Sequence, residues 1–145
     1  MKTLLVTLFA DADIGVSLDV ATTIAHQHDS HVIGYMPIPG PILIPVATPM
    51  TMVPFDDTMR TRFRDRLPAI RSAFEKRMTA EGLSFEFRSD ERTSLNLGPG
   101  IIAQGRTCDL VIVQMHAFED KITADSVEGV ADVVMACGRP VLALP

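Results

Sequence analysis

The chain has 145 residues, 47% of them apolar, and a formal net charge of −5. This length suits one domain spanning residues 1–145, and the apolar content is enough for a hydrophobic core. The negative net charge argues against nucleic acid as a partner, because nucleic-acid binders usually present a basic face. The first residues follow a strand pattern rather than that of a secretory leader, so we expect a cytoplasmic protein.

Strand and helix patterns alternate through the first 38 residues. An apolar run predicts a strand at residues 3–9, and a second strand is predicted at residues 31–38. Between them, Asp11 and Asp13 offer a carboxylate N-cap for a helix over about residues 14–27. Strand, helix and strand in this order predict a layered α/β domain.

Residues 30–55 contain no Asp, Glu, Lys or Arg but include six prolines. Each proline inside a helix would cost about 3 kcal/mol, which excludes a membrane-spanning helix. We therefore predict a long proline-rich loop over residues 39–57. Two alternatives remain open: the loop folds onto its own domain, or it forms an apolar arm that docks on a partner or covers a pocket.

The clearest helix follows this segment and is expected to end at Gly82. Its apolar positions are spaced by four, four, three, four and four residues: Met59, Phe63, Leu67, Ile70, Phe74 and Met78. Pro68 is expected to kink it. The remaining positions are rich in arginine, which could form a phosphate or nucleic-acid footprint. Interleaved acidic residues favour an ordinary solvated face instead.

The rest of the chain continues the alternation and ends in a strand–helix–strand unit. Strands are predicted at residues 83–88, 108–114 and 141–144, and helices at about residues 99–104 and 126–137. Two apolar strands joined by a helix belong in a parallel sheet with a right-handed crossover. Ligands of such sheets bind beyond the carboxyl ends of the strands, so the loop that starts at Gln114 is the candidate site.

Side chains that could carry chemistry are sparse. They are four histidines and two cysteines: His26, His28, His31, His116, Cys108 and Cys137. The histidines lack the companion ligands of a metal site, and no nucleophile–base pair is evident, so we expect neither a metal centre nor an enzyme. We expect the cysteines to be reduced, buried thiols, with a disulfide or a reactive thiol as the alternatives.

Three segments together resemble the universal stress protein family: MKTLLV at residues 1–6, CDLVIV at 108–113 and VVMACGRPVLALP at 133–145. The resemblance covers nearly the full chain apart from the proline-rich loop. It implies an open, Rossmann-like five-stranded parallel sheet of order 3-2-1-4-5 with helices on both faces. It also implies a protein that is usually dimeric.

Many members of that family bind ATP through a Gly-x2-Gly-x9-Gly-Ser/Thr pattern after the fourth strand, where glycines let the backbone approach the phosphates. The matching positions here are Gln114, Ala117, Val127 and Glu128, and all four depart from the pattern. Phe9 likewise stands where the family has an acidic nucleotide contact. We therefore predict that ATP binding is lost and that the protein carries no cofactor.

The replacements also have a structural interpretation. Asp125 and Glu128 match an N-terminal capping arrangement, in which carboxylates accept the free N–H groups at the start of a helix. Glu119 and Asp120 add negative charge to the same loop. A helix end satisfied by its own carboxylates would repel a triphosphate.

The resemblance and these departures predict a non-catalytic stress-response or regulatory domain that acts through self- or partner association. The expected surfaces of a homodimer are the Val141–Leu144 edge strand and the arm from Pro39 to Phe55. A chain ending where the family's domain ends would equally suit the first half of a tandem protein.

The alternative is a nucleotide or small-ligand sensor with a remodelled pocket at the ends of the first and fourth strands. The pocket positions would be Thr7, Phe9, Asp11, Asp13, Gln114, His116, Ala117, Val127 and Glu128.

Overall fold

The computed structural model describes residues 1–10, 12–40, 42–46, 51–92, 97–115 and 125–145. Five parallel strands form one sheet in the order β5-β2-β1-β6-β7. They are β1 (Thr3–Thr7), β2 (His31–Ile38), β5 (Phe85–Glu91), β6 (Leu110–Gln114) and β7 (Val141–Leu144). Numbered along the chain within this sheet, the order is 3-2-1-4-5, so the predicted topology is confirmed.

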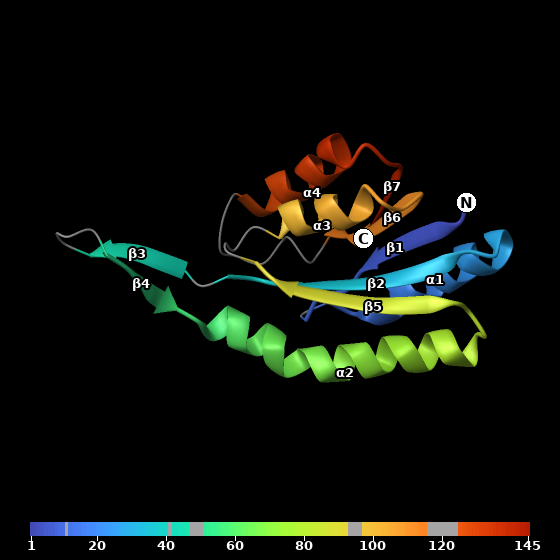
Figure 1. Cartoon of the computed structure of the whole chain (residues 1–145), viewed down its shortest axis with the longest axis horizontal. Helices are drawn as coiled ribbons and strands as arrows, with labels where there is room; N and C mark the ends of the chain where they lie inside the picture. Colours follow the sequence, from blue (N-terminus) through green and yellow to red (C-terminus); the bar gives the residue numbers. More distant parts are fainter. Residues whose placement is uncertain (11, 41, 47–50, 93–96, 116–124) are drawn as a thin grey trace.

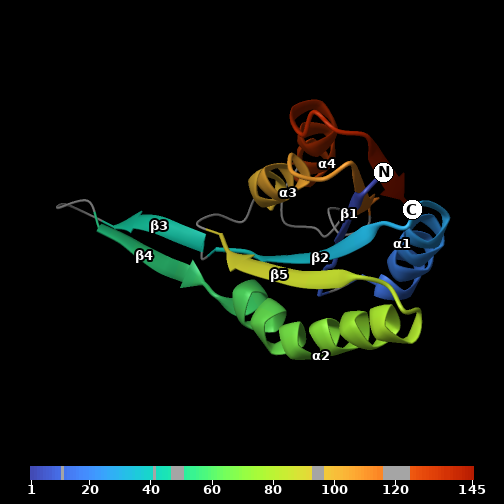
Figure 2. The same cartoon turned by 45° about the vertical axis from the view of Figure 1, so that its right-hand side comes forward.

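Four helices cover the two faces of the sheet. Helices α1 (Ile14–His28) and α2 (Thr58–Ala80) lie on one face, and α3 (Gly98–Gly105) and α4 (Asp125–Ala136) on the other (Figures 1 and 2). The Asp13 carboxylate caps α1 by accepting the Gly15 N–H at 2.9 Å, as predicted. No helix in the described ranges is both long enough and apolar enough to cross a membrane.

The core lies around the central strands, which are apolar on both faces. Leu4, Leu5 and Val6 of β1 are fully buried, and so are the apolar residues in the middle of β6. On the α2 side, the Phe74 ring packs edge-on against Phe85, with ring centroids 5.7 Å apart. Gly34 of β2 lies beneath this ring, and a Cβ there would come within 2.8 Å of it, so the close approach requires glycine.

The segment predicted as a proline-rich loop over residues 39–57 instead contains an antiparallel hairpin. Its strands are β3 (Ile42–Val46) and β4 (Thr51–Asp56), which pair with each other and not with the main sheet. Prolines are tolerated because each strand of a two-stranded ribbon has one edge that forms no ladder hydrogen bonds. Both views show the hairpin extending away from the five-stranded sheet (Figures 1 and 2).

Several boundaries also differ from prediction. β1 ends at Thr7 rather than at residue 9, although Leu8 and Phe9 are still buried. β5 begins at Phe85 and continues to Glu91, because it pairs with β2 along seven residues. α2 continues through Pro68 as one helix, and its axis changes direction partway along (Figure 1).

The amino terminus is held to β6 by one carboxylate. Asp109 Oδ2 accepts the backbone N–H groups of Lys2 and Thr3 at 2.6 and 3.0 Å. These backbone bonds hold the pKa of Asp109 below its usual value. They join the start of β1 to the start of β6.

We predict that Asp109 makes stability depend on acid pH. Because its folded-state pKa is lowered, its contribution is fully present above the unfolded-state pKa of about 3.9 and is lost as pH falls through the folded-state pKa. Urea denaturation as a function of pH should therefore show a shallower acid decline for Asp109→Asn than for the wild type. An identical decline in both proteins would contradict the prediction.

Candidate functional site

The candidate site lies where the strand order reverses. β1 pairs with β2 on one side and with β6 on the other, so the connections after β1 and β6 leave toward opposite faces. A crevice at the carboxyl ends of two such strands is the usual ligand position in open α/β sheets. Thr7 is the last residue of β1, and Gln114 is the last residue of β6.

Gln114 is 4% exposed, and both ends of its amide are engaged. Its Nε2 donates to the Asp13 carbonyl at 3.0 Å, and its Oε1 accepts a long bond of 3.4 Å from the Ser17 hydroxyl. A buried amide is stable when its donor and acceptor are satisfied, as here. The side chain therefore joins the end of β6 to the start of α1 and occupies the space between them.

The other described positions have structural roles. The Thr7 hydroxyl is fully buried and donates to the Ile112 carbonyl of β6 at 3.1 Å. Phe9 is 1% exposed and belongs to the hydrophobic core. The carboxylate of Asp13 caps α1. The structure thus gathers Thr7, Asp13 and Gln114 around the ends of β1 and β6, while Phe9 packs inward.

The remaining predicted positions can be placed only in part. Asp11, His116 and Ala117 lie outside the described residues. The backbone of Val127 and Glu128 belongs to the first turns of α4, and their side chains lie outside what is described. Their role in a pocket therefore stays a prediction.

Ser17 was missed by sequence reasoning although it contacts Gln114. It is fully buried on α1. It follows Ile14 by three residues and precedes Ala21 by four, so it lies on the apolar face of that helix. A polar residue at such a position signals a buried hydrogen bond, and that pattern could have identified it.

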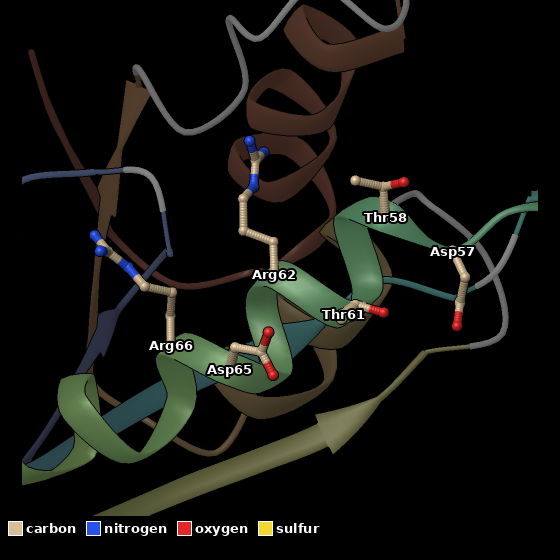
Figure 3. Close-up of a pocket in the computed structure, with 6 residues that line it drawn as sticks. All are labelled: Asp57, Thr58, Thr61, Arg62, Asp65 and Arg66. Atoms are coloured by element: carbon tan, nitrogen blue, oxygen red, sulfur yellow. The ribbon is translucent and has the colours of Figure 1, made fainter.

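A depression of about 600 Å³ lies beside the same end of the sheet, on the first turns of α2 (Figure 3). Its lining residues are Asp57, Thr58, Thr61, Arg62, Asp65 and Arg66. Arg66 Nε donates to the Ala10 carbonyl at 3.3 Å, which places this face of α2 against the chain just after β1. From the sequence, the arginine-rich face of this helix is predicted to be an ordinary solvated surface.

The cysteines are free thiols buried in the core, at 1% exposure for Cys108 and 2% for Cys137. Burial raises the pKa of both thiols, which lowers the thiolate fraction and hence the nucleophilicity at neutral pH. Among the histidines, His26 contacts Glu81 and His31 contacts Ser84. Within the described residues, no cluster of three or more His, Cys, Asp or Glu could hold a metal ion.

This topology recurs in solved structures of universal stress proteins. One from Burkholderia pseudomallei superposes with a TM-score of 0.69 at 17% identity, covering 99% of this chain and 96% of that one. One from Archaeoglobus fulgidus, in complex with dAMP, gives 0.64 at 14% identity, covering 100% and 98%. The protein therefore has the fold of this family over nearly its whole length, as the sequence predicted.

A further match has a different chain length. A putative universal stress protein from Pseudomonas aeruginosa superposes with a TM-score of 0.62 at 20% identity, and the match covers 99% of this chain but 43% of that one. The same fold unit thus forms less than half of a longer chain there. Neither a family model nor a curated protein matches this sequence.

We predict that Gln114→Leu lowers the free energy of unfolding by about 1–3 kcal/mol, because it leaves the buried Ser17 hydroxyl without its partner and removes the part-buried bond to the Asp13 carbonyl. Urea denaturation measures the difference. The matched control is Gln27→Leu, on the exposed side of α1, which should change stability by less than about 0.5 kcal/mol. Equal effects of the two substitutions would show that the Gln114 amide bonds are unimportant.

Proposed function

We propose that this protein is a universal-stress-protein-like, non-catalytic domain that regulates a stress response in the cytoplasm by association, without the family's usual ATP binding. The observation that carries the proposal is the buried Gln114 side chain at the position that corresponds to the first glycine of the family's ATP motif. Its amide donates to the Asp13 carbonyl and accepts from the Ser17 hydroxyl, both at the start of α1.

The physical argument concerns space and hydrogen bonding. A glycine at the end of β6 would let phosphates approach the backbone, whereas a glutamine fills that volume with a satisfied amide. Displacing it would break one buried and one part-buried bond, at a cost of about 1–3 kcal/mol for each group left buried without a partner. Phe9 acts in the same sense, because an apolar ring cannot accept a hydrogen bond from a ribose as a carboxylate does.

We predict that calorimetric titration with Mg-ATP gives no saturable heat at ligand concentrations up to about 1 mM. The titrated protein should be refolded from urea, so that no nucleotide from the expression host remains bound. Micromolar binding would overturn the loss of ATP binding and favour the second candidate function.

That second candidate is a nucleotide or small-ligand sensor with a remodelled pocket at the ends of β1 and β6. It is favoured by the Archaeoglobus structure, which has the same fold and holds dAMP. Titration with dAMP in place of ATP tests it directly. The sensor function requires saturable dAMP binding that Gln114→Leu alters.

Two surfaces support the association part of the proposal. β7 is the last strand in the sheet order, and in the described part of the chain one of its edges faces no other strand. Leu142 of this strand is exposed, and so is Met135 near the end of α4, which is 84% exposed. The β3–β4 hairpin also has open strand edges, and all of it except Asp56 belongs to the stretch without charged residues.

We predict a homodimer in sedimentation experiments, and a loss of dimer when either surface receives a charge. Leu142→Lys tests the β7 edge, and Ile44→Lys tests the hairpin. At least one of them should weaken association tenfold or more, or about 1.4 kcal/mol. Ala73→Lys, on an exposed part of α2, is the control and should leave the dimer intact. A wild-type monomer at about 1 mM would contradict self-association.

A further inference from the structure

β5 is the end strand of the sheet on the side opposite β7. Among the described residues it pairs with β2 alone, and Figures 1 and 2 show it as the outermost strand on its side of the sheet. None of its seven residues is buried, whereas seven of the eight residues of β2 are. One edge of β5, called here the open edge, can therefore receive an additional strand.

Two backbone bonds show which groups of β5 face this edge. The Val32 N–H donates to the Ser84 carbonyl at 2.9 Å, and the Arg92 N–H donates to the Ile38 carbonyl at 2.8 Å. Alternate residues of a strand bond to the same neighbour, and the register of β2 and β5 runs without a break between these two bonds. The even-numbered residues from 84 to 92 therefore direct their N–H and C=O groups to β2, and the odd-numbered residues direct theirs to the open edge.

Four charged residues alternate in sign along one face of this strand. They are Glu86, Arg88, Asp90 and Arg92, at every second position. This face is the α3 side, because Arg88 Nη1 donates to Gln104 Oε1 at 2.7 Å. Charges on an edge strand usually block further pairing, because an incoming strand must match them. The alternation makes the block selective, since a strand with the complementary order of charges fits.

The strand that fits is β5 of a second copy. An antiparallel partner must carry acidic, basic, acidic and basic side chains, in that order from its amino end, opposite these four residues. Residues 86–92 have that order themselves, in the sequence EFRSDER. With a two-fold axis at Ser89, Glu86 lies opposite Arg92 of the second copy, and Arg88 lies opposite Asp90. Moving the axis by one residue brings like charges opposite each other, and moving it by two keeps half of the charge pairs, so one register is favoured.

We propose that the open edge of β5 is a binding surface for β5 of a second copy, paired antiparallel about Ser89. In this register Phe87, Ser89 and Glu91 exchange main-chain hydrogen bonds with the same three residues of the second copy. The charged residues occupy the non-hydrogen-bonded positions, where opposite side chains come closest. The pairing is isologous and joins the two five-stranded sheets into one continuous sheet.

The ion pairs that these side chains already form are compatible with this pairing. Arg88 contacts Glu86, and Arg92 contacts Asp90 at 2.9 Å, in each case between neighbours on one strand. All four side chains are between 27% and 42% exposed. A carboxylate accepts up to about four hydrogen bonds and a guanidinium donates about five, so each group can keep its present contact and add one across the open edge.

The α2 side of the same edge also carries balanced charge. The Glu91 carboxylate pairs with Arg60 and Arg64 of α2. In the proposed register Glu91 lies opposite Phe87 of the second copy, whose ring lies 5.6 Å from the Arg71 guanidinium. The pairing therefore brings a cation toward Glu91 and leaves no carboxylate without a positive neighbour on this side.

Amide hydrogen exchange of the full chain, followed by NMR at about 50 µM and about 1 mM protein, tests the pairing. The amides of Phe87, Ser89 and Glu91 face the open edge, so we expect their exchange to slow by about threefold or more at the higher concentration. The even-numbered amides of β5 bond to β2 and should be protected at both concentrations. Unchanged exchange at all three odd-numbered amides would overturn the proposal.

A charge swap separates the pairs between copies from the pairs within one strand. Glu86→Lys should remove the concentration-dependent protection, because by symmetry it places two like-charge pairs in the interface. Adding Arg92→Glu restores opposite charges between the copies, while positions 86 and 92 each stay beside a like charge in their own strand. The double variant should therefore recover the protection. A double variant that behaves like Glu86→Lys alone would overturn the register.

The control is Asp132→Lys, which makes the same change in net charge as Glu86→Lys but on an exposed position of α4. It should leave the protection of β5 unchanged, and an equal loss in both variants would show unspecific charge effects and overturn the proposal. Protection of the even-numbered amides shows in each case that the variant is folded.

This inference rests on the proposed self-association and names a further surface for it, yet the two can fail separately. A dimer whose β5 amides exchange equally fast at both concentrations would support the proposed function and overturn the β5 surface. Protection of β5 that persists in both Leu142→Lys and Ile44→Lys would support the β5 surface and overturn β7 and the hairpin as the surfaces of association.

Discussion

The structure depends on the burial of β1 between β2 and β6. β1 is apolar on both faces, so helices must cover both sides of the sheet, and its parallel neighbours on each side require crossover connections. Those connections place α1 and α2 on one face and α3 and α4 on the other. The reversal of strand order at β1 then fixes where a ligand crevice can exist. The candidate site is therefore a consequence of topology before any polar residue is considered.

At that crevice, the described polar side chains at the ends of β1 and β6 bond to neighbouring parts of the protein itself. The Gln114 amide donates to Asp13 and accepts from Ser17 at the start of α1, and the Thr7 hydroxyl donates to a carbonyl of β6. These bonds stabilise the junction of two strands and a helix. Arg66 of α2 brings a guanidinium group to this end, where its Nε donates to the Ala10 carbonyl.

Much of the fold could be predicted from the sequence because the signals were local. An unbroken β-branched run marked β6, and Gly138 and Pro140 marked the start of β7. The four- and three-residue spacing of Phe63, Leu67, Ile70 and Phe74 marked α2. The β3–β4 hairpin was missed because proline lowers strand propensity in any local reading, while an isolated ribbon can accept proline on its outer edges. The Gln114–Ser17 contact spans 97 positions, and the bond from Arg66 to Ala10 spans 56, so a local pattern could mark Ser17 as a buried polar residue but could not identify the partner in either bond.

The long separation between β1 and β6 has a consequence for synthesis on the ribosome. The Thr7 hydroxyl finds its acceptor at Ile112, 105 positions later. At a translation rate of about 5–20 residues per second, several seconds pass between the emergence of these two strands. During that time β1 can pair with β2 but has an open apolar edge on its other side. Until most of the protein has been made, the nascent chain therefore exposes a strand with apolar side chains and unpaired backbone groups, to which chaperones or neighbouring nascent chains can bind.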